Sequence, residues 1–272
     1  MYNLVNMIER GLKPFYKRDF GVLLERMNIS TGDVVILHAS LKAFGYLIGG
    51  EDTLIGTILE RIGDSGTLVM PAQTTHISNP KYWENPSVPR EWEEMIRDSI
   101  APFDPVRTPV AKELGRVAGY FAFYPGVCRS GHPMYSFAAC GKEARYVTGN
   151  HGMDYGLGGD SPLGKLYGMG AKILLLGTDF ESNTSIHLAE YQLGRPDIME
   201  SAPVLVDGVK KWIEFKNVDL DVFDDFLDVE ELFFKKDSDK TVVSNIGDGS
   251  ALARVFDMKE CVDFCTEYYR NK

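Results

Sequence analysis

The stretch Val34-Val35-Ile36-Leu37-His38 is a continuous apolar run that ends in a histidine, and it decides the fold class. A short, uninterrupted run of branched aliphatic residues is typical of a strand that is buried on both faces. A helical pattern that begins at Asp52 follows it, and then a second apolar run, Thr67-Leu68-Val69-Met70, which Pro71 ends. Strand, helix and strand joined by short links form a βαβ unit, so the two strands are predicted to pair in parallel.

The rest of the chain continues this order, and the predicted fold class is α/β. We expect a single domain over residues 1–272, with a central, mostly parallel sheet flanked by helices. Two segments interrupt the pattern: an insertion over residues 74–110, rich in proline and aromatic residues, and a C-terminal β-hairpin over residues 201–217 with an Asp-Gly turn. The insertion is predicted to be ordered and to lie over the sheet edge. The acidic and aromatic residues 219–240 predict an exposed helix.

Composition restricts the partners and the compartment. A net charge of −10 argues against a nucleic-acid binder and suits a cationic small-molecule partner, because an acidic cleft concentrates positive ligands. No apolar run approaches the roughly 20 residues that span a bilayer, and the N-terminus lacks the order of a signal peptide, so we expect a cytoplasmic protein without a membrane partner. The four cysteines and five histidines fit no metal-ligand spacing, so no metal is predicted. A homodimer is compatible with the sequence.

The segment Thr184–Tyr191 carries the strongest candidate for chemistry. It follows the apolar run Ile173–Gly177 and begins a predicted helix, which Asn183 or Thr184 can cap. His187 then falls in the first turn, where the positive end of the helix dipole disfavours the imidazolium, and a neutral histidine suits a general base. Glu190 lies three residues on, so it could orient the ring or meet a cationic substrate. The alternative is a histidine that only packs the helix onto the sheet.

Three further clusters follow predicted strands, where ligands usually bind in open parallel sheets. Residues 38–45 form a loop that could hold a phosphate or a pantetheine chain, or could simply be a polar turn. Residues 129–141 contain His132 and Cys140, which permit a thiol nucleophile with a histidine base, although a core thiol is the alternative for Cys140. Residues 156–166 form a glycine-rich loop that lacks the spacings of phosphate-binding and dinucleotide-binding loops.

Together these segments resemble one family. The chain is similar over residues 20–265 to the aminoglycoside 3-N-acetyltransferases, the antibiotic acetyltransferase family that is distinct from the GNAT fold. The stretch Trp83–Trp92 most resembles a Bacillus-type branch. The segments that carry the resemblance occur in family order: His38-Ala39-Ser40-Leu41 with Gly45, Met70-Pro71, Pro105–Pro109, Arg129–Pro133 with Ser136-Phe137, Ser161–Gly164 and His187–Tyr191.

The resemblance implies direct transfer of an acetyl group from acetyl-CoA to the 3-amino group of a 2-deoxystreptamine ring. It implies His187 as the base and Glu190 as its partner or as a ligand for an ammonium group of the acceptor. Further acceptor contacts are expected from Gln73, Asp160 and Asp179, although each aspartate could instead be a cap or turn residue. The residues implied in coenzyme A binding are His38, Ser40, Leu41, Gly45, Met70, Thr108, Ser136, Phe137 and Ala138.

Departures from the family pattern leave alternatives open. Ala39 stands where the family more often has serine, and the run Ala72–His76 would alter the acceptor pocket. One competing hypothesis is an acyltransferase or hydrolase that uses Cys140 and His132. Another is a non-catalytic coenzyme A-binding protein.

Overall fold

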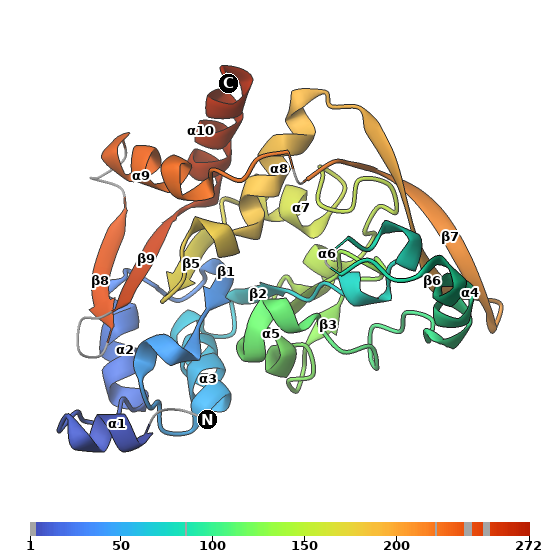
Figure 1. Ribbon diagram of the computed structural model, residues 1–272. Helices are drawn as coiled ribbons and strands as arrows, with labels where there is room; N and C mark the ends of the chain where they lie inside the picture. The colour runs from blue at the N-terminus through green and yellow to red at the C-terminus, as the bar shows by residue number, and fades with distance from the viewer. Residues whose placement is uncertain (1–3, 85, 221, 237–240, 247–250) are drawn as a thin grey trace.

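The computed structural model describes residues 4–84, 86–220, 222–236, 241–246 and 251–272 (Figure 1). It is an α/β domain whose principal strands are β1 (Val34–Ala39), β2 (Thr67–Pro71), β3 (Cys128–Arg129), β4 (Phe137–Gly141), β5 (Lys172–Leu176), β8 (Val242–Ile246) and β9 (Ala251–Asp257). The α-helices are α1 (Leu4–Glu9), α2 (Lys17–Arg26), α3 (Gly50–Ile62), α4 (Arg90–Ser99), α5 (Gly115–Phe121), α6 (Ala144–Thr148), α7 (Pro162–Met169), α8 (His187–Glu190), α9 (Phe226–Lys236) and α10 (Met258–Arg270).

The central sheet has the strand order β3-β4-β2-β1-β5-β9-β8. β1 pairs in parallel with β2 on one side and with β5 on the other, which confirms the predicted βαβ unit. β4 and β9 pair antiparallel to their neighbours on both sides. Five strands therefore run in one direction and two in the other, so the mostly parallel sheet is confirmed.

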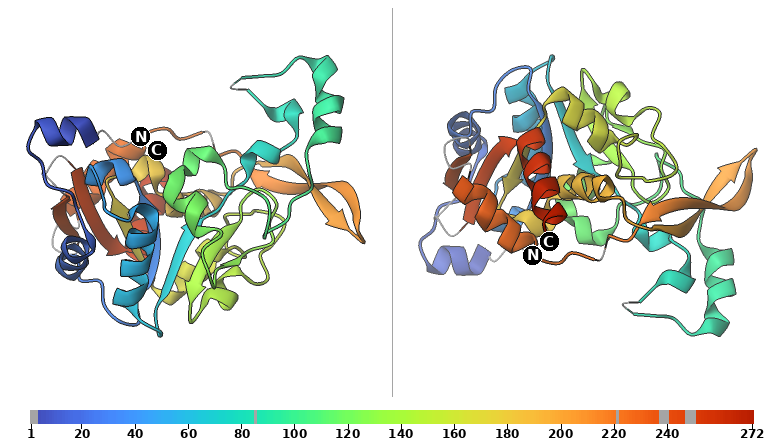
Figure 2. Two further views of the ribbon diagram at one scale, coloured as in Figure 1. Left: turned by 90° about the horizontal axis from the view of Figure 1, so that it is seen from below. Right: turned by 90° about the horizontal axis from the view of Figure 1, so that it is seen from above.

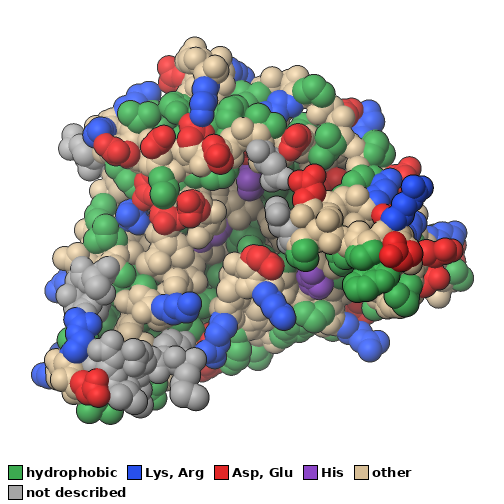
Figure 3. All heavy atoms as spheres, in the orientation of Figure 1, with side chains coloured by type: hydrophobic (Ala, Val, Ile, Leu, Met, Phe, Trp, Pro, Cys, Tyr) green, Lys and Arg blue, Asp and Glu red, His purple; other side chains and the backbone are tan. Residues whose placement is uncertain are grey.

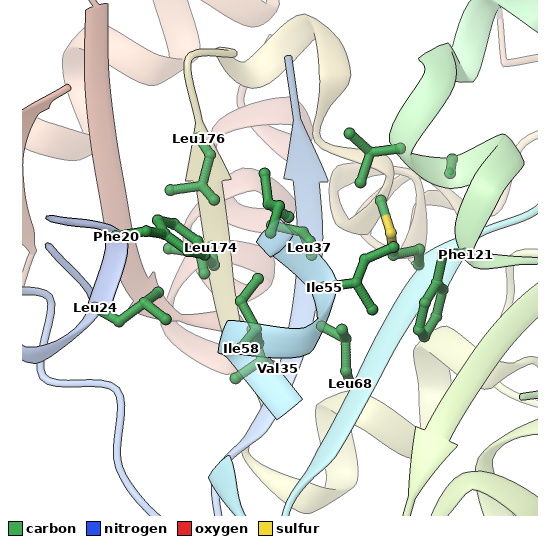
Figure 4. Close-up of a cluster of buried hydrophobic side chains, with 14 of the residues drawn as sticks. Phe20, Leu24, Val35, Leu37, Ile55, Ile58, Leu68, Phe121, Leu174 and Leu176 are labelled. Atoms are coloured by element: carbon green, nitrogen blue, oxygen red, sulfur yellow. The ribbon is translucent and has the colours of Figure 1, made fainter. Parts of the chain in front are cut away.

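Helices cover both faces of the sheet and bury two separate cores. Side chains alternate along β1, so Val35 and Leu37 face one core and Ile36 faces the other. The first core packs Phe20 and Leu24 of α2, and residues of α3 such as Ile55 and Ile58, onto β1 and β5 (Figure 4). Helices α7, α8, α9 and α10 supply side chains to the second core. Burial on both faces explains why the strand sequences are continuous apolar runs.

The predicted hairpin is confirmed and is longer than expected. β6 (Asp197–Val206) and β7 (Val209–Val218) form a separate two-stranded sheet, and Asp207 and Gly208 in the turn both have positive φ. The hairpin projects from the body beside α4, as Figure 2 shows. The insertion is ordered, but α4 does not cover the sheet edge as expected. It packs on the hairpin instead, with the Arg97 guanidinium 4.5 Å from the ring of Trp212.

The helix predicted after residue 219 is present, but it is partly buried and not exposed as expected. α9 begins at Phe226 and buries Val229, Glu230 and Phe233, which lie on one helical face because they are three or four residues apart. The ring of Phe233 contacts Phe264 of α10 and Phe256 of β9, with centroids 5.5 and 5.3 Å away. Asp228 and Glu231 lie on the exposed face of the helix, whereas Glu230 is buried and pairs with Arg254 at 3.2 Å.

Candidate active site

The candidate site is a cleft at the carboxyl ends of β1 and β5. The chain leaves β1 toward β2 on one side and returns to β5 on the other, so this is a topological switch point, where α/β sheets usually bind ligands. The cleft has a volume of about 660 Å³ and is lined by residues that follow β1, β2 and β5 and by the start of α5. Figure 3 shows a hollow near the centre of this face, with histidine side chains inside it.

Local sequence places His187 at this cleft. β5 ends at Leu176, and Gly177 turns the chain with φ +66°. The Asn183 side chain then caps a short 3-10 turn by accepting a hydrogen bond from the backbone N–H of Ser185, so the first of the two predicted caps is confirmed. His187 follows as the first residue of α8, with its side chain 26% exposed. Since α8 is only four residues long, it offers little dipole to act on the ring.

His187 and Glu190 form a hydrogen-bonded pair. Nδ1 of His187 lies 2.5 Å from Oε2 of Glu190, whose side chain is fully buried. An ionised carboxylate can only accept a hydrogen bond, so the shared proton belongs on Nδ1. The lone pair of the neutral ring is then on Nε2. Such a ring has the arrangement of a general base that a carboxylate orients.

The other carboxylate oxygen of Glu190 is also occupied. Nη1 of Arg195 donates to Oε1 over 3.2 Å. With both oxygens held by protein groups and no exposed surface, Glu190 is not placed to bind an ammonium group of a substrate, so of the two expected roles the structure favours orientation of the ring. Arg195 was missed in the sequence. The only signal was a cation five residues after Glu190, in a Gly-Arg-Pro turn.

Several residues expected to bind the donor or the acceptor do line the cleft: His38, Ser40, Leu41, Met70 and Gln73. Side chains that the sequence did not single out join them. Lys42 and Arg116 contribute positive charge, although Arg116 pairs with Glu51 at 2.8 Å. Glu113 and Glu181 contribute carboxylates. The cleft thus combines cations for an anionic group with carboxylates for a cationic group.

His38 is the most deeply buried histidine of the cleft. His38 is only 6% exposed, and its Nε2 atom is buried without a hydrogen-bond partner among the described residues. Burial lowers its pKa to about 3, because the charged ring would lose its hydration. His38 is therefore neutral at physiological pH.

Five expected donor contacts lie outside the cleft lining. Phe137 and Ala138 are fully buried in β4, where they face the two cores. Gly45 ends the 3-10 turn Leu41–Phe44 with φ +64°. Thr108 and Ser136 instead surround the guanidinium of Arg129, which donates to the Thr108 carbonyl over 2.5 Å and to Ser136 Oγ over 3.1 Å. The contact of these five residues with the donor stays a prediction.

The two expected acidic acceptor contacts also lie elsewhere. Asp179 caps the 3-10 turn Phe180–Ser182 by accepting from the Glu181 N–H, and it lines a separate hollow with Glu230 and Arg254. Asp160 is exposed, in a turn whose carbonyl accepts from the Gly152 N–H. Both residues take the turn and cap roles that were the alternative in the sequence.

The thiol hypothesis is contradicted by the sheet geometry. Cys140 packs with the first core, whereas the His132 ring lies 5.0 Å from the ring of Phe215 in the second, so the sheet separates them. Nδ1 of His132 accepts from the N–H groups of Met134 and Tyr135, and Nε2 donates to the Met153 carbonyl. Burial raises the pKa of Cys140 and lowers that of His132 to about 3. His132 is therefore not placed to act as a base for this thiol.

Within the described residues, no group of three or more His, Cys, Asp or Glu side chains is arranged to hold a metal ion. In the same part of the chain, none of the helices combines the length and the apolar character needed to cross a membrane.

Known proteins are similar to this chain over almost its whole length. Residues 36–270 match the family described as aminoglycoside 3-N-acetyltransferase. The chain is 36% identical over 266 residues to the Bacillus subtilis SPbeta prophage-derived aminoglycoside N(3')-acetyltransferase-like protein YokD, covering 97% of this chain and 96% of that protein. The crystal structure of YokD superposes with a TM-score of 0.89 over 96% of this chain and 95% of YokD.

Other members of the family are similar at lower identity. Aminoglycoside N(3)-acetyltransferase VII of Streptomyces paromomycinus is 32% identical over 216 residues, which is 78% of this chain and 74% of that enzyme. The structure of AAC-IIIb in a binary complex with CoASH has a TM-score of 0.83 and 25% identity, over 94% of this chain and 96% of that one. The chain therefore belongs to the aminoglycoside 3-N-acetyltransferase family, and it is an acyltransferase with the fold of that family rather than the GNAT fold.

Proposed function

We propose that this protein transfers an acetyl group from acetyl-CoA to the 3-amino group of an aminoglycoside, with His187 as the general base. The observation that carries the proposal is the His187–Glu190 pair, which is fixed by a 2.5 Å hydrogen bond at the wall of the cleft. A partly exposed ring held by a buried carboxylate is typical of a base and is more than packing alone requires.

The chemistry explains the need for a base. An amine attacks a thioester carbonyl only when its nitrogen has a free lone pair, and amino groups of aminoglycosides are largely protonated at neutral pH. The 3-amino group therefore first loses one proton to solvent, and Nε2 of His187 would then accept a second proton from the neutral amine as its nitrogen forms the bond to the acetyl carbon. The tetrahedral intermediate then expels the thiolate of coenzyme A, and the imidazolium returns the proton to that sulfur. The products are the acetamide and free coenzyme A.

The donor side of the proposal rests on the cations of the cleft. Coenzyme A carries a pyrophosphate and a 3'-phosphate, and Lys42 and Arg116 could each meet one of these anionic groups. The volume of about 660 Å³ is within the range of pockets that enclose small-molecule ligands. The CoASH complex of AAC-IIIb supports the same donor here.

The acceptor side rests on the carboxylates of the same cleft. An aminoglycoside has several ammonium groups, and Glu113 and Glu181 could bind those that do not react. Gln73, also in the lining, could donate to or accept from a hydroxyl group. The net charge of −10 favours the approach of such a polycation.

The test is an acetylation assay over a panel of aminoglycosides and polyamines, read as release of free coenzyme A. We expect turnover with 2-deoxystreptamine aminoglycosides and acetylation at the 3-amino group by NMR of the product. His187→Gln should reduce kcat by about 10²–10⁴-fold with unchanged affinity for coenzyme A, since it removes the base only. Lys17→Gln is the control, because Lys17 is exposed, pairs with Glu60 and lies outside the cleft lining.

Two results would overturn the proposal. Coenzyme A binding without turnover on any acceptor would indicate a non-catalytic coenzyme A-binding protein. Wild-type turnover by His187→Gln would show that another group is the base.

A further inference from the structure

Arg195 has an unusual position behind the candidate base. It follows the 3-10 turn Tyr191–Leu193 and precedes β6, and its side chain is only 10% exposed. Both of its hydrogen bonds come from Nη1: one to Oε1 of Glu190 over 3.2 Å and one to the carbonyl oxygen of Asp219 over 2.6 Å. One guanidinium nitrogen thus ties α8 to the segment that follows β7.

Aromatic packing holds the guanidinium in place. Its central carbon lies 4.2 Å from the centre of the Phe223 ring, which in turn stacks on Tyr269 of α10 at 4.1 Å and an interplanar angle of 11°. A cation over an aromatic face is attracted by the ring quadrupole, and the planar guanidinium suits this contact. Arg195 is therefore held by Glu190, five residues earlier, and by the segment that contains Asp219 and Phe223.

The positive charge of Arg195 compensates the buried charge of Glu190. Glu190 has no exposed side-chain surface, and a buried carboxylate is very costly unless a positive charge or a proton compensates it. Arginine supplies a charge that does not depend on pH in the physiological range. With Arg195 beside Oε1, Glu190 can remain ionised and accept the Nδ1 proton of His187.

The other titratable groups around Glu190 do not supply this charge. Tyr191 and Tyr269 are near enough to Glu190 to feel its charge, and burial raises the pKa of both hydroxyls, so they are neutral. Asp225 and Lys272 lie farther out, beside Tyr269 and Phe223, and they pair with each other at 2.6 Å. Among the described residues, Arg195 is the cation that bonds to Glu190.

We propose that Arg195 is a positioning residue that keeps Glu190 ionised, so that His187 carries its proton on Nδ1 and presents an unprotonated Nε2 to the cleft. The kinetic consequence rests on the proposed function, but the protonation state of the ring does not. Without Arg195, the negative charge of Glu190 would be uncompensated, and the Glu190–His187 pair would bind a further proton more readily.

The experiment is a pH titration of the His187 ring by ¹⁵N NMR in the full-length protein without substrate. Arg195→Gln retains an amide that can donate to the Asp219 carbonyl but removes the charge. We expect the titration midpoint of the ring to move to higher pH by about one unit, because a nearby cation disfavours protonation. Arg195→Lys should restore the wild-type midpoint, since one ammonium can make both bonds that Nη1 makes.

Arg61→Gln is the matched control. Arg61 is a half-buried arginine whose Nε donates to the Ile29 carbonyl over 2.6 Å, remote from the cleft lining. Its replacement should leave the His187 midpoint unchanged. In the acetylation assay, the pH below which kcat falls should move upward in Arg195→Gln by the same amount as the NMR midpoint.

An unchanged midpoint in Arg195→Gln would overturn the proposal, whereas a shifted midpoint in a protein that acetylates nothing would refute only the proposed function. Should Arg195→Gln fail to fold, the double variant Glu190→Gln with Arg195→Gln decides. Charge compensation predicts that the double variant folds, because the uncompensated charge is gone. If it does not fold, the role of Arg195 is packing alone.

Discussion

Nδ1 of His187 lies 2.5 Å from Oε2 of Glu190, and the two residues are three apart on a helix of only four residues. This spacing places both side chains on the same helical face. The ring reaches the cleft while the carboxylate stays in the core. The pair is therefore local in sequence, but its two environments are set by the tertiary fold.

Glu190→Gln tests the orientation of the ring. The amide can turn its NH₂ group toward Nδ1, so that the ring proton moves to Nε2 and the base is lost. We expect kcat for acetylation to fall by about 10²–10⁴-fold with little change in KM for acetyl-CoA. Glu60→Gln serves as control, because Glu60 is exposed, pairs with Lys17 and lies outside the cleft lining. A loss of less than threefold in Glu190→Gln would contradict the pairing.

Gly177→Ala tests the turn that brings the chain from β5 to the site. Gly177 has φ +66°, and a Cβ there would meet the Cβ of Ala43 at 2.0 Å. The strained backbone and the contact should lower the free energy of unfolding by about 2–4 kcal/mol, measured by urea denaturation. Gly168→Ala in α7 is the control. It has open space and no positive φ, so we expect it to be neutral or to stabilise by up to about 1 kcal/mol.

His132→Asn tests whether the buried His132 ring, which packs against the second core, is neutral. Burial lowers the pKa of His132 to about 3, below the unfolded value of 6.5, so its contribution to stability is complete above pH 6.5 and is lost as the pH falls toward 3. Asparagine can still accept from the two backbone N–H groups but does not titrate. The loss of unfolding free energy between pH 7 and pH 5 should be about 1–2 kcal/mol smaller in the variant. Equal losses in the two proteins would contradict the burial of a neutral ring.

Cys140→Ser tests the separation of the thiol from the chemistry. Cys140 lies in β4 on the core opposite to His132, so the variant should retain turnover within about twofold of wild type. Mass spectrometry after mixing wild-type protein with acetyl-CoA should show no acetyl adduct on this cysteine. An adduct that disappears in the variant, together with loss of turnover, would restore the thiol mechanism.

Much of the fold could be predicted because its signals are local. The apolar runs of β1, β2 and β5 identify strands buried on both faces, and Asp207-Gly208 identifies the hairpin turn. The position of α4 could not be predicted in this way. Its Arg97 contacts Trp212 more than a hundred residues later, and no local pattern records that contact.

The residues of the site could likewise be predicted only where the signal is local. His187 and Glu190 could be predicted as a pair from helical spacing, and residues after β1 could be expected at the carboxyl edge of the sheet. Thr108, Ser136 and Ala138 were expected to contact the donor. Ser136 and Ala138 are buried, and half-buried Thr108 accepts from Arg129 through its backbone carbonyl. The family pattern identifies such residues without showing whether they face the ligand or support the residues that do.

The sequence by itself determined the α/β order, the hairpin turn and the histidine–glutamate spacing, because each depends on residues a few positions apart. Only the tertiary structure decided that Glu190 is fully buried, that Arg195 compensates its charge and that Cys140 and His132 lie on opposite faces of the sheet. The physical reason is that burial and charge pairing depend on distances in space between segments that packing brings together. The same histidine can be a packing residue or a base, and its surroundings in the folded chain make the difference.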